Sequence, residues 1–332
     1  SMKDMLKDKF GRTINYLRLA VVDRCNLRCT YCMPENGLPW IKQNELMTDD
    51  EIIRLCNIFT QLGVDKIRIT GGEPFVRKNC MELIHRISQI NKLNELSITT
   101  NGILTEPFIP QLKAAGIKSV NLSLDTLDEN RFFKITRRNE FWQVMKTMES
   151  LLSNNIQVKI NCVVMDGQNI EDIIPLVNLG KTLPIAVRFI EEMPFNGDNK
   201  EISLKWNQHN IYQHIQEHFG EINKLQDPIS STSYNYKIPG FKGEFGIIAA
   251  YSRSFCGDCN RGRISPLGVL KTCLYEGGGI NLKDEMRLGK TDMELKDLII
   301  QSVQHKPKDG WEAEKISLDP NTIHQSMATI GG

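Results

Sequence analysis

Residues 17–37 read LRLAVVDRCNLRCTYCMPENG. The first six residues are rich in apolar and β-branched side chains, which is the pattern of a short strand. Three cysteines follow at the spacing C-x3-C-x2-C, at Cys25, Cys29 and Cys32. Structural zinc sites and iron–sulfur clusters both take four ligands, so three cysteines leave one metal position open. Because barrel enzymes place their chemistry at the carboxyl ends of strands, the segment predicts an iron–sulfur site with one open iron there.

Strand-like runs alternate with helical stretches over the first two thirds of the chain. One helical stretch covers residues 48–62, where Thr48 and Glu51 form the pattern of a capping box ahead of an amphipathic segment. Strands that alternate with helices predict βα units and a parallel sheet or barrel. The further strands are predicted at residues 66–70, 96–101, 119–125, 157–165 and 185–193.

The predicted strands have one apolar face and one polar face. Successive side chains of a strand point to opposite faces, so Val120, Leu122 and Leu124 share one face. A closed eight-stranded barrel would fill its interior with branched apolar residues, and this pattern does not. We therefore expect an α/β fold, an incomplete TIM-like (βα)6 barrel with a polar and basic interior; the alternative is a sheet with one solvated face. The cations on polar faces are Arg18, Arg68, Lys159 and Arg188.

Length and composition predict a globular protein of two domains. We expect a partial-barrel domain at residues 1–223 and a small C-terminal domain with antiparallel strands at residues 224–332, where short apolar runs and Gly/Pro turns dominate. The 41 basic and 40 acidic residues nearly balance, which argues against a nucleic-acid partner. No apolar run approaches the length of a membrane span, and we expect a cytoplasmic protein. In that compartment clustered cysteines indicate metal binding before disulfides.

A second cysteine triplet lies near the other end of the chain, at Cys256, Cys259 and Cys273. It is again one ligand short of a closed site, and no histidine lies between residues 219 and 304 to complete a zinc knuckle. A second iron–sulfur cluster is the favoured interpretation, and structural zinc is the alternative. The three remaining cysteines are separate in the sequence and are expected to pack as apolar side chains; they are Cys56, Cys80 and Cys162.

The first triplet, followed by Gly71-Gly72-Glu73-Pro74 after the second strand, resembles the radical S-adenosylmethionine superfamily. The likeness to the GTP 3′,8-cyclase family extends over nearly the whole chain. It is carried by KIRITGGEPFVR, ITTNG, NLSLDTLD, VRFIEEMPFNGDN, the second triplet with Arg261-x-Arg263, and the terminal Gly331-Gly332. The second triplet and the Gly-Gly end are the more selective of these motifs.

This resemblance implies an activity and its cofactors. The enzyme would be a lyase that converts GTP to (8S)-3′,8-cyclo-7,8-dihydroguanosine 5′-triphosphate, the first step of molybdopterin cofactor biosynthesis. Two [4Fe–4S] clusters and S-adenosylmethionine are implied. A 5′-deoxyadenosyl radical would take hydrogen from ribose C3′, which then attacks guanine C8.

The resemblance also assigns roles to residues. Cys25, Cys29 and Cys32 would hold the first cluster, and Cys256, Cys259 and Cys273 the second, whose open iron would meet the guanine. The residues implied to contact S-adenosylmethionine are Tyr31, Gly72, Ser123 and Met193. Those implied to contact GTP are Arg18, Arg68, Thr99, Lys159, Arg261 and Arg263. The residues implied to support catalysis are Arg261, Arg263, Gly331 and Gly332.

The implied partners are GTP, a reductant such as flavodoxin or ferredoxin, and the next enzyme of the pathway, cyclic pyranopterin monophosphate synthase. A homodimer is possible, and neither nucleic acid nor membrane is expected. One alternative function is a twin-cluster peptide or sulfatase maturase, which would have a peptide groove and more C-terminal cysteines. Another is an iron–sulfur electron carrier or zinc module, which would not need residues 71–74 or a cationic interior.

Overall fold

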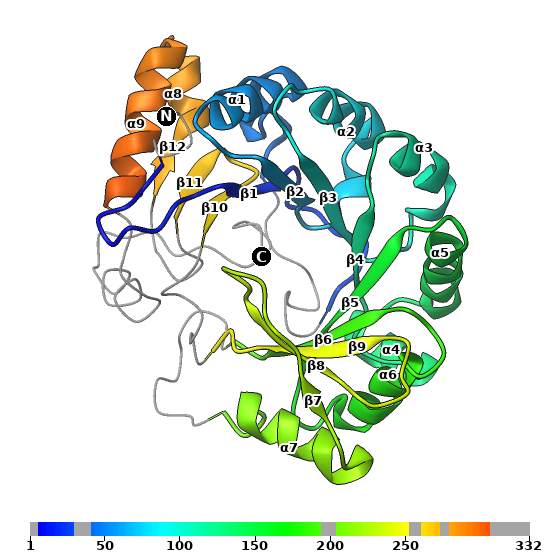
Figure 1. Ribbon diagram of the computed structural model, residues 1–332. Helices are drawn as coiled ribbons and strands as arrows, with labels where there is room; N and C mark the ends of the chain where they lie inside the picture. The colour runs from blue at the N-terminus through cyan, green and yellow to red at the C-terminus, as the bar shows by residue number, and fades with distance from the viewer. Residues whose placement is uncertain (1–5, 30–40, 194–203, 252–259, 273–278, 306–332) are drawn as a thin grey trace.

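The computed structural model describes residues 6–29, 41–193, 204–251, 260–272 and 279–305. Six strands follow one another in chain order and pair in parallel. Figure 1 shows them as a strongly curved sheet with the connecting helices on its outer side. The strands are β1 (Tyr16–Ala20), β2 (Lys66–Thr70), β3 (Glu95–Thr100), β4 (Ser119–Ser123), β5 (Gln157–Val164) and β6 (Ala186–Glu191). The helices are α1 (Asp49–Gln61), α2 (Cys80–Ser88), α3 (Ile109–Ala114), α4 (Glu129–Thr136), α5 (Phe141–Ser153) and α6 (Ile173–Leu179).

Strands from the last third of the chain extend both edges of this sheet. At one edge β9 (Glu244–Ile248) pairs in parallel with β6, and the antiparallel strands β8 (Ser233–Lys237) and β7 (Asn223–Lys224) follow it. At the other edge β10 (Arg261–Ile264) pairs in parallel with β1. Beyond it lie the antiparallel strands β11 (Val269–Lys271) and β12 (Ile280–Asn281). Among the described residues the ladder runs from β12 to β7 without closing, which confirms the incomplete barrel.

The antiparallel strands predicted for the C-terminal segment are present, but they continue the barrel sheet instead of forming a separate layer. The predicted boundary between residues 223 and 224 falls within β7 and stays a prediction. The remaining helices are α7 (Gln208–Phe219), α8 (Leu282–Arg287) and α9 (Asp292–Gln304). Short 3-10 turns lie at η2 (Gln43–Glu45), η3 (Pro74–Val76), η4 (Glu106–Phe108) and η5 (Ile170–Asp172).

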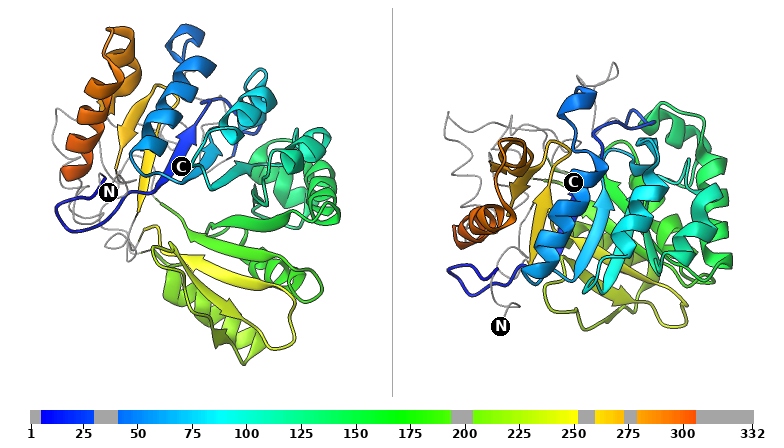
Figure 2. Two further views of the ribbon diagram at one scale, coloured as in Figure 1. Left: turned by 45° about the horizontal axis from the view of Figure 1, so that its top comes forward. Right: turned by 90° about the horizontal axis from the view of Figure 1, so that it is seen from above.

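The helix α1 begins where the capping box was predicted. The backbone N–H of Glu51 donates to Thr48 Oγ1 at 3.1 Å, and the backbone N–H of Thr48 donates to Glu51 Oε1 at 2.9 Å, so two orphan donors are satisfied. Arg287 of α8 then pairs with the same Glu51 carboxylate at 2.9 Å, and Arg54 of α1 pairs with Asp292 of α9 at 2.7 Å. These contacts hold α8 and α9 beside α1, as both views in Figure 2 show.

The hydrophobic core lies between the outer face of the sheet and the helices. Leu17, Ile67, Val120 and Val158 are all 0% exposed there, as the strand alternation predicted. The opposite, polar face is also shielded, because Arg68 is 3%, Ser97 1% and Asn121 4% exposed. The alternative of an ordinary solvated face is therefore wrong: the polar side chains line a barrel interior.

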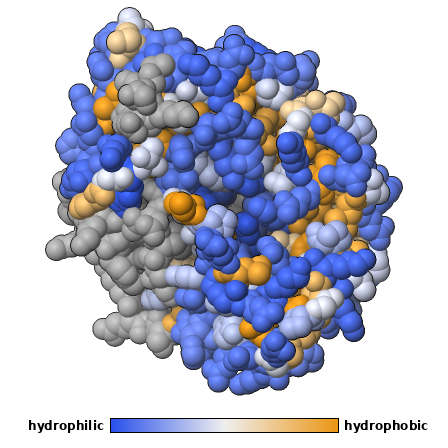
Figure 3. All heavy atoms as spheres, in the orientation of Figure 1, coloured by the Kyte–Doolittle hydropathy of each residue, from blue (hydrophilic) through white to orange (hydrophobic). Residues whose placement is uncertain are grey.

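The outer surface of the molecule is mostly hydrophilic on the side shown in Figure 3. Large apolar side chains are exposed at a few positions, such as Trp142 on α5 and Leu288 after α8. No helix in the described ranges has the length and apolar character needed to cross a membrane.

Candidate active site

The loop after β1 carries the first cysteine triplet, of which Cys25 and Cys29 are described and Cys32 is not. Cys25 Sγ accepts hydrogen bonds from the backbone N–H of Leu27 at 3.4 Å and from Asn101 Nδ2 at 3.7 Å. Hydrogen bonds to the sulfurs suit thiolates that hold an iron–sulfur cluster, and they tune its reduction potential. The Asn101 amide also donates to Asn26 Oδ1 at 2.6 Å, so it fixes the cysteine loop at two points.

The Gly71–Pro74 segment packs directly on that cysteine loop. The backbone N–H of Gly72 donates to Val22 O at 3.0 Å, and that of Glu73 donates to Arg24 O at 2.8 Å. A Cβ atom at Gly72 would lie 1.9 Å from Arg24 O, so the close approach of two backbones requires glycine there. The proposed contact of Gly72 with S-adenosylmethionine stays a prediction.

Glu73 joins the ends of β2 and β3. Its buried carboxylate accepts from Thr100 Oγ1 at 2.6 Å, from the backbone N–H of Asn101 at 2.7 Å and from that of Phe75 at 3.2 Å. Burial raises the pKa of Glu73 to about 7, although these three donors favour the carboxylate. The cysteine loop, Gly72, Glu73 and Asn101 are therefore one hydrogen-bonded unit at the carboxyl ends of β1, β2 and β3.

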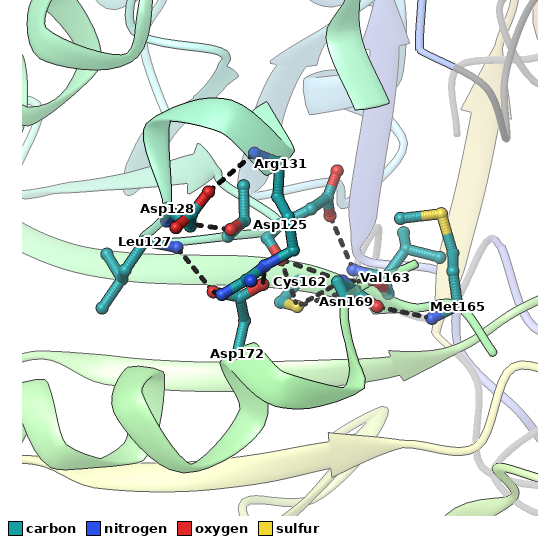
Figure 4. Close-up of polar contacts among 10 residues, drawn as sticks. Asp125, Leu127, Asp128, Arg131, Cys162, Val163, Met165, Asn169 and Asp172 are labelled. Carbon is teal, nitrogen blue, oxygen red and sulfur yellow. Dashed lines mark hydrogen bonds and ion pairs between the residues drawn. The ribbon is translucent and has the colours of Figure 1, made fainter. Parts of the chain in front are cut away.

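A second polar network holds the carboxyl ends of β4 and β5, next to Ser123 (Figure 4). Asn169 Nδ2 donates to the carbonyl oxygens of Asp125 and Val163, both at 2.8 Å, and Asn169 Oδ1 accepts from the backbone N–H of Met165 at 2.8 Å. Asp125 Oδ1 accepts from the backbone N–H of Val163 at 2.9 Å. The loop that follows Ser123 is therefore fixed to β5 through buried partners.

The strand register gathers cations inside the barrel. Arg18 on β1 lies opposite Arg263 on β10 and Arg68 on β2. Tyr16 precedes Arg18 by two residues on the same face of β1, and it lies in register between Arg261 of β10 and Lys66 of β2. Like charges on directly neighbouring strands are destabilising, so this arrangement costs stability unless an anion compensates it.

Three of the cations inside the barrel are not paired with a described carboxylate. Within the described ranges no carboxylate forms an ion pair with Arg68, Lys159 or Arg188. Burial, followed by the charges of neighbouring cations, lowers the pKa of Lys159 to about 8 and also lowers the pKa of Arg188. Burial likewise lowers the pKa of Arg18 to about 9, although Tyr16 opposes the shift.

Several buried polar atoms of the interior have no hydrogen-bond partner among the described residues. Buried polar groups are normally satisfied, so these atoms fit a polar ligand in the barrel. The atoms are Thr70 Oγ1, Ser97 Oγ, Thr99 Oγ1, Asn121 Oδ1, Asn161 Oδ1 and Arg188 Nε. The cations can bind phosphate groups, and the polar atoms without partners can form hydrogen bonds with the rest of such a ligand.

Comparison with known proteins agrees with this arrangement. The model of the radical SAM superfamily matches residues 19–180, and the model of Molybdenum Cofactor Synthesis C matches residues 185–311. The chain is 42% identical over 308 residues to GTP 3′,8-cyclase of Clostridium perfringens (strain SM101 / Type A), covering 91% of this chain and 94% of that relative. This chain belongs to the GTP 3′,8-cyclase family.

Longer relatives are also similar to this member of the GTP 3′,8-cyclase family. It is 40% identical over 304 residues to Molybdenum cofactor biosynthesis protein 1 of Bos taurus, and it spans 48% of that relative's length. Among solved structures, Streptococcus suis SuiB matches with a TM-score of 0.61 at 15% identity, covering 90% of this chain and 68% of that chain. Native anSMEcpe with bound AdoMet and a peptide matches with a TM-score of 0.54 at 16% identity, covering 93% and 84%. These structures show the same fold.

The structure brings part of the predicted site of this family member together. Arg18, Arg68, Arg261 and Arg263 meet on three adjacent strands. Thr99 and Lys159 flank Asn121 in one row across β3, β4 and β5. Ser123 ends β4 and Met193 follows β6, both at carboxyl ends. The residues that lie outside the described ranges are Tyr31, Cys32, Cys256, Cys259, Cys273, Gly331 and Gly332.

The sequence did not assign roles to Tyr16, Glu73 or Asn101. Glu73 and Asn101 belong to motifs that the resemblance quoted, GGEP and ITTNG, so their place in a family motif was the available signal. The isolated cysteines Cys56, Cys80 and Cys162 are buried, as predicted, and burial raises the pKa of each thiol.

Replacing Asn169 by Ala is expected to lower the free energy of unfolding by about 2–4 kcal/mol, because it leaves several buried backbone groups without partners. Chemical denaturation of the purified protein measures this. The matched control is Asn178→Ala on the exposed side of α6, which should change stability by less than about 0.5 kcal/mol. Equal effects of the two changes would contradict the role of the network.

Replacing Gly72 by Ala is expected to displace the cysteine loop and to lose the first cluster. Iron content after anaerobic reconstitution should fall by about four atoms per chain, the content of one [4Fe–4S] cluster. Gly262→Ala is the control, because its added Cβ would have no neighbour closer than 3.6 Å. Full iron content in the Gly72 variant would show that the two loops need no such close contact.

Proposed function

We propose that this chain is a radical S-adenosylmethionine enzyme that converts GTP to (8S)-3′,8-cyclo-7,8-dihydroguanosine 5′-triphosphate. The observation that carries the proposal is the cation cluster inside the barrel, formed by Arg18, Arg68, Arg261 and Arg263 on the adjacent strands β1, β2 and β10, which fits a triphosphate. Charge-assisted hydrogen bonds contribute about 1.5–3 kcal/mol each, so several arginines together can hold GTP firmly. The relative named GTP 3′,8-cyclase, nearly all of whose length this chain covers, supports the same substrate.

The barrel separates the phosphate site from the radical source. Arg18 lies in the middle of β1, while the cysteine loop begins after Val22, four residues further along an extended chain. At about 3.3 Å per residue this places the cation row about 13 Å from that loop. A nucleotide bound by its phosphates at the cation row would direct its sugar towards the carboxyl ends of the strands.

The residues at the carboxyl ends fit the cofactors of the superfamily. We assign Cys25, Cys29 and Cys32 to a [4Fe–4S] cluster, supported by the hydrogen bonds to Cys25 Sγ. Tyr31, Gly72, Ser123 and Met193 are assigned to S-adenosylmethionine on the open iron. When bound and reduced, the cluster and S-adenosylmethionine would supply the 5′-deoxyadenosyl radical that takes the hydrogen atom from ribose C3′; after C3′ bonds to guanine C8, one electron from the reductant and one proton would complete the 7,8-dihydro product. The protein's own part is to hold GTP so that only C3′ is presented.

A second [4Fe–4S] cluster on Cys256, Cys259 and Cys273 is part of the proposal. Cys259 precedes Arg261, the first residue of β10, by only two positions in the sequence. Because β10 pairs with β1, a cluster bound there would lie at the edge of the interior that carries Arg18. We propose that Arg261 and Arg263, with Gly331 and Gly332, support catalysis, and that Thr99 and Lys159 complete the GTP site.

The remaining partners also stay proposals. A flavodoxin or ferredoxin would supply electrons, and cyclic pyranopterin monophosphate synthase would take the product; a cytoplasmic location and a homodimer are consistent with these roles. The likeness to SuiB and anSMEcpe concerns the fold and does not favour a peptide substrate. An electron carrier or zinc module would not need a cation-lined interior.

Anaerobically reconstituted protein is expected to hold about eight irons, four for each [4Fe–4S] cluster, and to convert GTP in the presence of S-adenosylmethionine and a reductant. Chromatography and mass spectrometry of the product, with metal analysis, measure this. ATP in place of GTP is the control and should give no cyclised product. Cleavage of S-adenosylmethionine that ignores GTP would contradict the substrate, and zinc in place of iron would contradict the mechanism.

Replacing Cys256 by Ala is expected to leave the first cluster and S-adenosylmethionine cleavage in place while cyclisation is lost. Iron content and the two reaction products, measured side by side, separate these effects. Cys56→Ala is the matched control, because Cys56 is buried in α1 and should leave both iron content and cyclisation near wild type. Retained cyclisation in the Cys256 variant would overturn the role given to the second cluster.

A further inference from the structure

Tyr16 lies at the centre of the cation cluster and has no assigned role. It is the first residue of β1, is 4% exposed, and sits in register between Arg261 of β10 and Lys66 of β2. Lys66 Nζ lies 4.5 Å and Arg261 Cζ 4.7 Å from the centroid of its ring. Both distances are within the range of cation–π contacts, so the ring attracts a cation from each neighbouring strand.

The hydroxyl group of Tyr16 makes the shortest polar contact of Arg68. Arg68 Nε donates to Tyr16 Oη at 2.7 Å, whereas the other hydrogen bond of this guanidinium, from Nη1 to Ile98 O, is 3.4 Å long. Arg68 is 3% exposed, so its charge is held away from water. Since the phenolic oxygen is the acceptor, the contact does not require the phenolic proton and is stronger when that proton is absent.

The charges that surround Tyr16 favour its ionised form. Burial raises the pKa of Tyr16, but the neighbouring cations outweigh it and lower this pKa from 10.0 to about 7. The lowering cations are Arg68, Arg18, Arg261 and Lys66, and Arg263 lies opposite Arg18 on the next strand. Among the described carboxylates, Glu95 pairs with Lys66 at 3.5 Å.

We propose that Tyr16 is the internal counter-ion of the cation cluster, a phenolate that balances the arginines in the absence of substrate and takes up one proton when a nucleoside triphosphate binds. This inference rests on the proposed GTP site. The triphosphate brings several negative charges to the cations, which removes the reason for Tyr16 to stay ionised. The proton comes from solvent, and the neutral hydroxyl still accepts from Arg68 Nε.

The pH dependence of GTP binding follows from linkage. Above about pH 7 the phenolate is the main form, so binding takes up nearly one proton and affinity falls up to tenfold for each pH unit. Below about pH 6 Tyr16 is already protonated and this contribution disappears. A tyrosine without an ionic role would leave the pH profile of binding unchanged on replacement by phenylalanine.

Calorimetric titration of reconstituted enzyme with GTP, without S-adenosylmethionine, tests the proposal. Repeating it in buffers of different ionisation enthalpy at pH 6 and pH 8 counts the protons taken up. We expect wild type to take up nearly one proton more than Tyr16→Phe at pH 8, and the two to agree at pH 6. Protonation of GTP itself cancels in this difference. Tyr212→Phe on α7 is the control and should match wild type.

Equal proton uptake by wild type and Tyr16→Phe at pH 8 would overturn the role of Tyr16. Failure of wild type to bind GTP at all would instead overturn the proposed function. If Tyr16→Phe does not fold, wild type labelled with 13C at the tyrosine ζ carbon decides the matter by NMR with oxidised clusters. One of the seven tyrosine signals should move from the phenolate to the phenol position on addition of GTP, and no such movement would overturn the proposal.

Discussion

The in-register parallel pairing of β1 with both β2 and β10 is the constraint on which the interior depends. It forces Arg18, Arg68 and Arg263 into one row, although strand neighbours of like charge repel each other. A folded protein keeps such a row only where the charge is compensated. The closer of the two acceptors of Arg68 is the phenol oxygen of Tyr16, at 2.7 Å. The same register therefore explains the shifted pKa values, the open polar atoms and the affinity for a polyanion that we propose.

The carboxyl ends of the strands are organised by a different principle. Here the backbone of the Gly71–Pro74 segment lies on the backbone of the cysteine loop, and one buried carboxylate, Glu73, bonds to the end of β3. The side-chain amide of Asn101, which follows β3, donates a hydrogen bond to Cys25 Sγ. Each described member is held by hydrogen bonds to its neighbours, so the surroundings of Cys25 are set before any cofactor binds. Such preorganisation suits the radical chemistry that we propose, which must reach one carbon atom of the substrate.

Much of the barrel could be predicted from the sequence because its signals are local. The strand at residues 66–70 coincides with β2, and the capping box at Thr48 starts α1 as expected. Alternation assigned the inner and outer faces correctly, since Val120 and Arg68 lie where period two places them. The pairing of β10 with β1 could not be predicted, because it joins segments about 245 residues apart and leaves no local pattern. Tyr16 was missed for the same reason: its partners come from other strands.

The two edges of the parallel sheet are both covered by strands from the last third of the chain, with β9 on β6 and β10 on β1. The halves that the two family models match are thus parts of one continuous ladder. Separating them as hinged domains would break backbone hydrogen bonds along both edges and expose unpaired strands to other chains. Separation of these halves to admit a ligand would therefore cost the pairing of β5 with β6 and of β1 with β10. If GTP binds as we propose, it would enter past the ends of the strands or on the side where the described ladder does not close, while β1, β2 and β10 keep their pairing.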